Sequence, residues 1–136
     1  MGSADESALL ELANRYATIV DERRFTDLAQ VFTADAVLET GRGRRDGLPE
    51  IVAAMQGLHR YDRTDHRVLR SQVSVEPTTA TGTVDCEAHH WFTEAGTRRD
   101  HQMEITYHDR YLATPNGWRL SHRRLEIHRA ETVDVD

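Results

Sequence analysis

The sequence predicts a single α+β domain over residues 1–136, in which helices come first and a meander of antiparallel strands follows. Apolar residues recur with helical period near the start of the chain, whereas long alternating segments separated by turn residues fill its second half. The connections between these segments are short, so consecutive strands are expected to pair as antiparallel neighbours. We therefore expect a sheet with helices covering one of its faces.

The helical part begins with an amphipathic segment at residues 4–22. Its apolar residues recur with helical period, as in Leu9, Leu12, Ala13, Tyr16 and Val20. Asp21 lies just beyond the edge of this apolar stripe, so its carboxylate faces either a cavity or water. A second short helix is expected at 26–32, a short strand at 34–40 and a third helix at 49–56, after a glycine-rich break.

Four strands are expected in the second half, at residues 65–75, 80–92, 101–112 and 118–128. The last of them contains a phase slip, because Trp118 and Leu120 share one parity whereas Leu125 and Ile127 share the other. A β-bulge between Ser121 and Arg124 explains the slip, and bulges often lie near active sites. The alternative is a strand that bends at a sheet edge.

Composition excludes several classes of protein. The formal charge is −6, with 38% hydrophobic and 29% charged residues, which describes a globular chain without the basic balance of a nucleic-acid binder. No apolar run approaches the length of a membrane span, and the N-terminus lacks a signal-peptide pattern. A cytoplasmic location is therefore expected, with neither nucleic acid nor membrane as a partner.

The inventory of side chains narrows the chemistry further. All 17 basic residues are arginine, so Schiff-base chemistry and a lysine general base are excluded. Cys86 is the only cysteine, which rules out an internal disulfide and a cysteine-based zinc site. Because Cys86 alternates with Val84 and Ala88, a small buried residue is favoured over a nucleophile.

Strand parity separates the two histidines of the segment His89-His90-Trp91. His90 shares a face with Val84, Cys86, Ala88 and Phe92, whereas His89 points to the opposite face. The two rings therefore cannot chelate one metal from a regular strand. A histidine on an apolar face is either a core group with its hydrogen bonds satisfied or a pocket residue, and parity leaves both interpretations open.

Five motifs together resemble a known family. They are VDE at 20–22, LAQVFTADA at 28–36, DH at 65–66, DRY at 109–111 and NGWRL at 116–120. In this combination the chain resembles, over nearly its whole length, the SnoaL-like branch of the nuclear-transport-factor-2-like superfamily. The resemblance implies a strongly curved, mainly antiparallel sheet that forms a cone-shaped pocket closed by helices. It also implies a homo-oligomer, with a dimer as the expected state, and no cofactor.

Within that superfamily, the pattern is similar to that of scytalone dehydratase and hexachlorocyclohexane dehydrochlorinase, which use an aspartate–histidine pair to drive elimination. Asp21 matches the family aspartate on the first helix, and His66 matches the histidine on the following long strand. His90 matches a second histidine when the strand glycine is aligned with Gly82. The resemblance therefore adds to parity in favouring a pocket position for His90.

Two departures from the pattern concern the substrate. Val20 and Thr40 stand where scytalone dehydratase carries pocket tyrosines, so its substrate should not be assumed. Tyr16 stands one helical turn before Asp21, where the dehydrochlorinase carries a lysine. Tyr16 either reaches the pocket from another angle or is a core tyrosine with its hydroxyl satisfied.

The expected chemistry uses His66 as general base, because a histidine imidazole titrates near neutral pH. Asp21 would hold one ring nitrogen and stabilise the imidazolium, while His90 or Tyr16 would donate a hydrogen bond to a carbonyl or leaving oxygen. Such a set supports a dehydratase, cyclase or isomerase acting on a small, partly apolar, carbonyl-bearing substrate such as a polyketide, steroid or terpenoid intermediate.

Two alternatives remain at this stage. The same fold also serves as a non-catalytic module that binds a hydrophobic ligand or mediates dimerisation. Asp21, His66 and His90 also form, in principle, a two-histidine, one-carboxylate iron site. These three residues come from separate elements without a local ligand motif, so no metal is expected.

Overall fold

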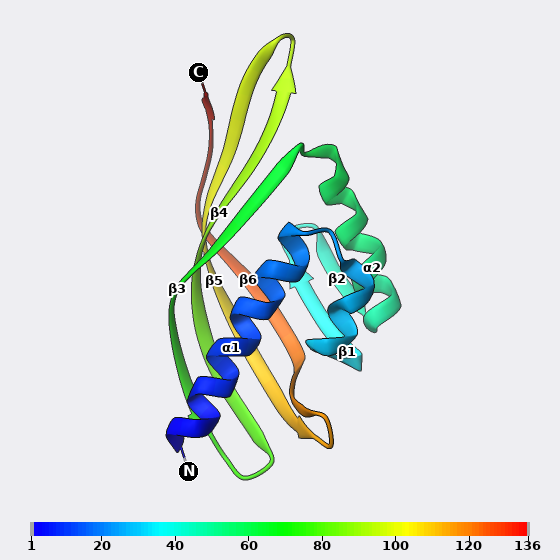
Figure 1. Cartoon of the computed structure of the whole chain (residues 1–136), viewed down its shortest axis with the longest axis vertical. Helices are drawn as coiled ribbons and strands as arrows, with labels where there is room; N and C mark the ends of the chain where they lie inside the picture. The colour runs from blue at the N-terminus through cyan, green and yellow to red at the C-terminus, as the bar shows by residue number, and fades with distance from the viewer. Residues whose placement is uncertain (1, 136) are drawn as a thin grey trace.

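The computed structural model describes residues 2–135, and the side chains from residue 4 onward. Helices and short strands come first, and four long strands follow (Figure 1). The elements are α1 (Gly2–Asp21), the 3-10 helix η1 (Phe25–Gln30), β1 (Phe32–Thr40), β2 (Gly43–Asp46), α2 (Leu48–Met55), the 3-10 helix η2 (Gln56–Arg60), β3 (Arg63–Val75), β4 (Thr79–Glu94), β5 (Thr97–Thr114) and β6 (Gly117–Asp134).

The strands form one six-stranded sheet in the order β2-β1-β6-β5-β4-β3. Only the β1–β6 pair is parallel among these neighbours, and the others are antiparallel. Figure 1 shows a long, curved sheet with α1 running across it and α2 beside β1 and β2. The predicted α+β class and the antiparallel meander are confirmed. The sheet is open, because β2 and β3 lie at opposite edges.

Two local features differ from the expected elements. The segment 26–32 was expected to be a helix, but only residues 25–30 form a 3-10 turn, and Phe32 already begins β1. Strand β2 was not expected, since its residues GRRD carry no apolar alternation. It forms because it pairs with β1 across a tight turn in which Gly43 adopts φ 121°, a conformation that favours glycine.

The core lies between α1 and the sheet face that it covers. Leu9, Leu12 and Tyr16 of α1 are buried together with Val84, Cys86 and Ala88 of β4. The prediction that Cys86 is a small buried residue is confirmed, since it is only 3% exposed. None of the helices among residues 2–135 is both long and apolar enough to cross a lipid bilayer.

The predicted phase slip in the last strand is a β-bulge at Ser121. Arg110 pairs with His122 and Tyr111 pairs with Leu120, which leaves Ser121 as an extra residue in β6. Because side chains alternate along a strand, the extra residue turns Arg123 toward the side that Leu120 faces, the buried side of the sheet. The bulge therefore places an arginine in the protein interior.

Asp109 compensates the charge of Arg123. The two residues are register partners on β5 and β6, and two hydrogen bonds of 2.8 Å join Nε and Nη2 of Arg123 to the two carboxylate oxygens. Their side chains are 1% and 0% exposed. Tyr111 donates a third hydrogen bond, of 3.0 Å, to Asp109 Oδ2. The charged pair is thus fully enclosed and bidentate, which is the geometry that a buried ion pair requires.

Strands β3 and β4 approach each other closely at Gly82. A Cβ atom on Gly82 would lie 2.6 Å from the carbonyl oxygen of Gln72 and 2.7 Å from Cγ1 of Val73. Both contacts are shorter than van der Waals distance, and one of them is to backbone. The absence of a side chain at Gly82 therefore allows β3 and β4 to lie this close together.

We expect Gly82→Ala to lower the free energy of unfolding by about 1–3 kcal/mol, because the new methyl group forces β3 away from β4. Urea unfolding followed by circular dichroism measures the change. Gly57→Ala is the matched control, since nothing lies within 4 Å of its added Cβ. Equal stability of the two variants would contradict the role of Gly82.

We expect Asp109→Asn to lower the free energy of unfolding by about 3–5 kcal/mol, because Arg123 then remains buried without a counter-charge. The double variant Asp109→Leu/Arg123→Met removes both charges and is expected to be more stable than Asp109→Asn alone. Urea unfolding of both variants tests this order. A double variant that is the less stable of the two would show that the pair itself, rather than the orphaned charge, determines the loss.

Candidate functional site

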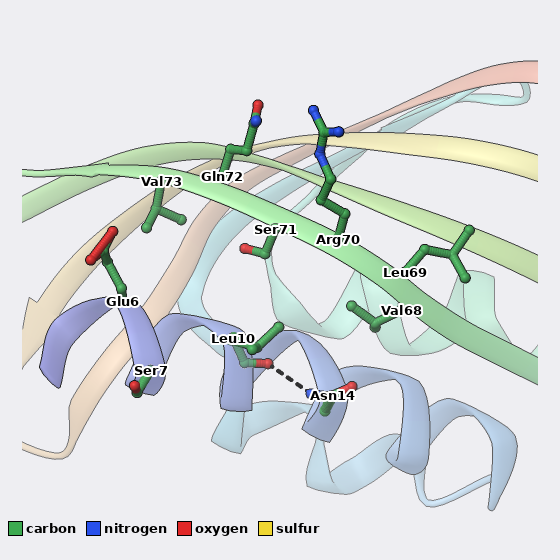
Figure 2. Close-up of a pocket in the computed structure, with 10 residues that line it drawn as sticks. All are labelled: Glu6, Ser7, Leu10, Asn14, Val68, Leu69, Arg70, Ser71, Gln72 and Val73. Atoms are coloured by element: carbon green, nitrogen blue, oxygen red, sulfur yellow. Dashed lines mark hydrogen bonds between the residues drawn. The ribbon is translucent and has the colours of Figure 1, made fainter. Parts of the chain in front are cut away.

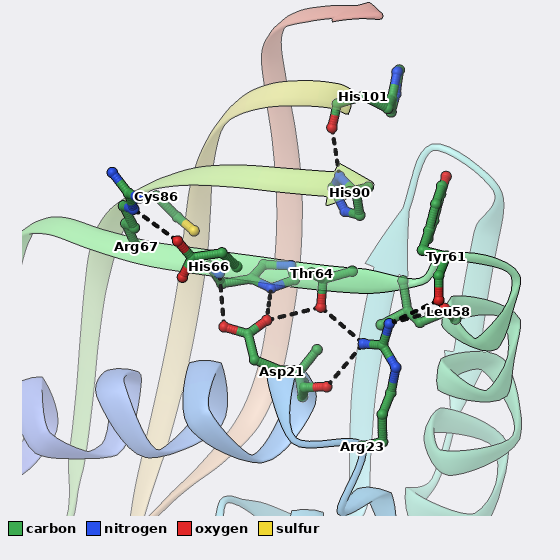
Figure 3. A network of polar contacts seen from close by, with 12 residues as sticks. Asp21, Arg23, Leu58, Tyr61, Thr64, His66, Arg67, Cys86, His90 and His101 are labelled. Atoms are coloured by element: carbon green, nitrogen blue, oxygen red, sulfur yellow. Dashed lines mark hydrogen bonds and ion pairs between the residues drawn. The ribbon is translucent and has the colours of Figure 1, made fainter. Parts of the chain in front are cut away.

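The structure brings Asp21 and His66 together at the end of α1. Asp21 is the last residue of the helix, and its carboxylate faces β3 (Figure 3). Its Oδ1 lies 2.7 Å from Nδ1 of His66, and its Oδ2 accepts a hydrogen bond of 2.8 Å from the backbone N–H of the same residue. The side chains are 20% and 8% exposed, respectively. The two residues therefore form a partly enclosed dyad.

The carboxylate determines which nitrogen of His66 carries the proton. An ionised carboxylate only accepts hydrogen bonds, so Nδ1 of a neutral His66 is the protonated nitrogen and Nε2 has a free lone pair. Among the described residues, none is hydrogen-bonded to Nε2. The dyad is thus oriented to accept a proton at Nε2.

Two residues that the sequence analysis missed hold Asp21 in place. Thr64 donates a hydrogen bond of 2.9 Å to Asp21 Oδ1, and Arg23 Nη1 donates one of 2.8 Å to the Thr64 hydroxyl. Arg23 adopts φ 62° and also binds the carbonyl oxygens of Val20, at 3.3 Å, and Leu58, at 3.2 Å. Thr64 shares the strand parity of His66, which was the available signal, whereas nothing local indicated Arg23.

His90 lies beside the dyad. Its ring centroid is 5.6 Å from that of His66, at an interplanar angle of 86°. Its Nδ1 lies 2.8 Å from the backbone carbonyl oxygen of His101. Burial lowers the pKa of His90 to about 4, so the ring is neutral at pH 7. Because a carbonyl only accepts, Nδ1 carries the proton and Nε2 of His90 is an acceptor.

His89 points to the opposite side of β4 from His90, as parity predicted. Its Nδ1 lies 2.7 Å from Asp100 Oδ2, while Asp100 Oδ1 accepts a hydrogen bond of 3.0 Å from the backbone N–H of His90. Burial by itself would raise the pKa of Asp100, but hydrogen bonds from His89, Gln102 and the His90 backbone lower it. Asp100 thus links the two histidines across the strand.

Tyr16 lies deeper in the interior, away from the dyad. Its ring packs edge-on against Phe32 and Tyr107, each at 5.9 Å, and the Arg123 guanidinium lies 4.5 Å from its centroid. Burial raises the pKa of Tyr16 to about 12 and that of Cys86 to about 11, so both side chains are protonated at neutral pH. Nη1 of Arg123 is buried and has no partner among the described residues.

A cavity of about 480 Å³ is lined by Arg42, Arg60, Tyr61, Phe92, His101 and Thr132. The aromatic rings of Tyr61 and His101, which line it, lie 5.0 and 5.9 Å from the His90 ring. A groove of about 690 Å³ lies elsewhere, between α1 and the edge strand β3 (Figure 2). Its lining includes Leu10 and Leu69 but none of the dyad residues, so its size does not make it the reaction site.

Asp21, His66 and His90, which were considered as an iron site from the sequence, are not arranged as a group of metal ligands in the structure. Among residues 2–135, no three histidine, cysteine, aspartate or glutamate side chains are grouped as metal ligands. His90 Nδ1 faces a carbonyl oxygen, and His66 Nδ1 faces Asp21. Both carboxylate oxygens of Asp21 are already used by His66 and Thr64.

Two sequence comparisons relate this chain to known proteins. A model of the SnoaL-like domain matches residues 2–124. An uncharacterised protein of Mycobacterium tuberculosis strain H37Rv is 32% identical over 124 residues, which are 88% of this chain and 83% of that protein.

Solved structures extend the comparison. A candidate scytalone dehydratase of Novosphingobium aromaticivorans has a TM-score of 0.86 at 19% identity, covering 99% of this chain and 90% of its own. A hexachlorocyclohexane dehydrochlorinase of Novosphingobium barchaimii has a TM-score of 0.83 at 17% identity, covering 96% and 90%. A nuclear-transport-factor-2-like protein of Salmonella enterica serovar Typhimurium has a TM-score of 0.80 at 17% identity, covering 93% of each chain. The chain therefore belongs to the SnoaL-like family and has the nuclear-transport-factor-2-like fold.

Proposed function

We propose that this protein is a small-molecule lyase or isomerase, of the dehydratase or cyclase type, in which Asp21 and His66 act as a paired general base. The observation that carries the proposal is the 2.7 Å contact between Asp21 Oδ1 and His66 Nδ1, which leaves Nε2 free to accept a proton. The substrate would be small, partly apolar and carbonyl-bearing, such as a polyketide, steroid or terpenoid intermediate.

The first step would be removal of a proton from the carbon next to a carbonyl. His66 Nε2 takes the proton, and the bonding electrons pass to the carbonyl oxygen as an enolate. Asp21 stabilises the imidazolium that forms, and Thr64 and Arg23 keep the carboxylate aligned. The enolate then expels a leaving group, reprotonates at another carbon or attacks a second carbonyl.

Either His90 or Tyr16 was expected to donate a hydrogen bond to the developing enolate. The protonated Nδ1 of His90 is used by the His101 carbonyl oxygen, so its Nε2 is an acceptor and does not suit this role. Tyr16, the other donor expected from the sequence, keeps a protonated hydroxyl. We propose Tyr16 as the donor to the developing enolate.

The structural comparisons support the reaction class only in part. The two Novosphingobium proteins are named for removal of water and of hydrogen chloride, which are both eliminations. Their sequence identity lies below 20%, so the likeness concerns the fold. The non-catalytic alternative, in which the dyad is a buried hydrogen-bonded couple inside a binding module, is an outcome of the experiment below.

We expect the wild type to accelerate deuterium uptake next to the carbonyl of at least one cyclic hydroxyketone in D2O, followed by NMR. This readout reports proton removal whether elimination, isomerisation or cyclisation follows. His66→Ala is expected to lower the exchange rate by about 10²–10⁴-fold, because the base is lost. Asp21→Asn is expected to lower it over a similar range, because the amide favours the wrong tautomer of His66.

The matched control is His122→Ala. His122 also pairs with a carboxylate, since its Nε2 lies 2.6 Å from Glu39 Oε2, but it points away from the buried side of β6. This variant should exchange like the wild type. Equal exchange rates for the wild type and His66→Ala would refute the base, and no exchange with any ketone would favour the binding module.

The neutral state of His90 predicts a pH dependence of stability. A folded-state pKa of about 4, below the ordinary histidine value of 6.5, means that the unfolded chain binds the proton more readily. Stability from this residue is therefore complete above about pH 6.5 and declines by about 3 kcal/mol as the pH falls toward 4. Urea unfolding across this range should show a steeper decline for the wild type than for His90→Gln. Parallel curves would contradict a neutral, buried His90.

A further inference from the structure

We propose that the cavity beside His90 binds an oxyanionic group, so that the substrate is amphipathic. Its apolar, carbonyl-bearing part would enter toward the dyad, and a carboxylate, sulfonate or phosphate would remain in this cavity. The inference rests on the proposed function in one respect, because only an enzyme has a substrate. Binding of the anion can be tested independently of catalysis.

The cations of this cavity come from separate parts of the chain. Arg42 lies in the turn between β1 and β2, and Arg60 is the last residue of η2. The Arg42 backbone N–H donates a hydrogen bond of 3.1 Å to the Thr40 hydroxyl, which orders the turn. The fold therefore brings two guanidinium groups to one cavity of about 480 Å³.

The charge of the cavity differs from that of the molecule. The protein carries a net charge of −6, yet no carboxylate is among the described residues that line the cavity. Within the described part of the chain neither Arg42 nor Arg60 forms an ion pair, whereas the adjacent Arg44 binds Asp46 at 2.9 Å. Two unneutralised guanidinium groups present donors in the fork geometry that oxyanions match.

The remaining lining suits an aromatic or otherwise apolar body. Tyr61 and Phe92 pack with ring centroids 6.0 Å apart, and the Arg60 guanidinium lies 5.1 Å from the Tyr61 ring. His101 directs Nδ1 to the Thr132 hydroxyl, at 2.8 Å. A ligand held here would thus contact both apolar ring surfaces and cations.

The rings that line the cavity contact His90, which in turn contacts the dyad. The Tyr61 ring lies 5.0 Å from His90, and His90 lies 5.6 Å from His66. Arg23, which holds Asp21 through Thr64, also approaches the Tyr61 carbonyl oxygen at 3.5 Å. An anion bound by Arg42 and Arg60 would therefore hold the rest of a ligand against His90.

A matched pair of fluorescent probes tests the inference. 8-Anilinonaphthalene-1-sulfonate and N-phenyl-1-naphthylamine share their aromatic body, and only the first carries an oxyanion. We expect Arg42→Gln/Arg60→Gln to weaken binding of the sulfonate about 10-fold or more and to leave binding of the neutral amine within twofold. Arg110→Gln/Arg124→Gln, which changes the net charge equally on the opposite face of the sheet, should leave both affinities unchanged.

Three outcomes would overturn the oxyanion site. They are an unchanged affinity for the sulfonate, an equal loss for both probes, and an equal loss in the control variant. Displacement of the sulfonate by 2-naphthoate or by 2-naphthyl phosphate then distinguishes a carboxylate from a phosphate as the preferred group. His66→Ala should bind the sulfonate like the wild type, because His66 does not line the cavity, so failure of the base and failure of the anion site are separable.

Discussion

The candidate site depends on the hydrogen bonds that the Asp21 carboxylate accepts. This carboxylate accepts hydrogen bonds from the Thr64 hydroxyl and from both the backbone N–H and the ring of His66, so one side chain joins the end of α1 to β3. These contacts set the tautomer of His66 and the position of its ring together. The same strand, β3, packs closely against β4 at Gly82.

The interior controls protonation by burial. His90 stays neutral and the Tyr16 phenol stays protonated because water is excluded around both. The buried Arg123 is tolerated because Asp109 neutralises it with two hydrogen bonds, while its Nη1 has no partner among the described residues. The interior thus combines a neutral histidine, a protonated phenol and a paired arginine without a net buried charge.

Some of this arrangement followed from pattern alone. Helical phase placed Asp21 at the edge of the apolar stripe, and strand parity separated His90 from His89. Parity also located the bulge, but its consequence was missed. Arg123 has the parity of Leu125 and Ile127 beyond the bulge, which was a sufficient signal that it points inward. Arg23 gave no such signal, since its partners Leu58 and Thr64 are distant in sequence.

The sequence by itself determined the α+β class, the antiparallel meander and the opposite faces of His89 and His90, because hydrophobic period and turn residues are local properties. Tertiary structure decided the protonation pattern and the partners. The distance from Asp21 to His66, the hydrogen bond between His90 Nδ1 and a backbone carbonyl, and the placement of Arg42 and Arg60 in one cavity all depend on how the curved sheet brings remote segments together. Hydrogen bonds and burial depend on which groups lie within a few ångströms of each other in space. A local sequence pattern does not show which residues from distant parts of the chain come that close.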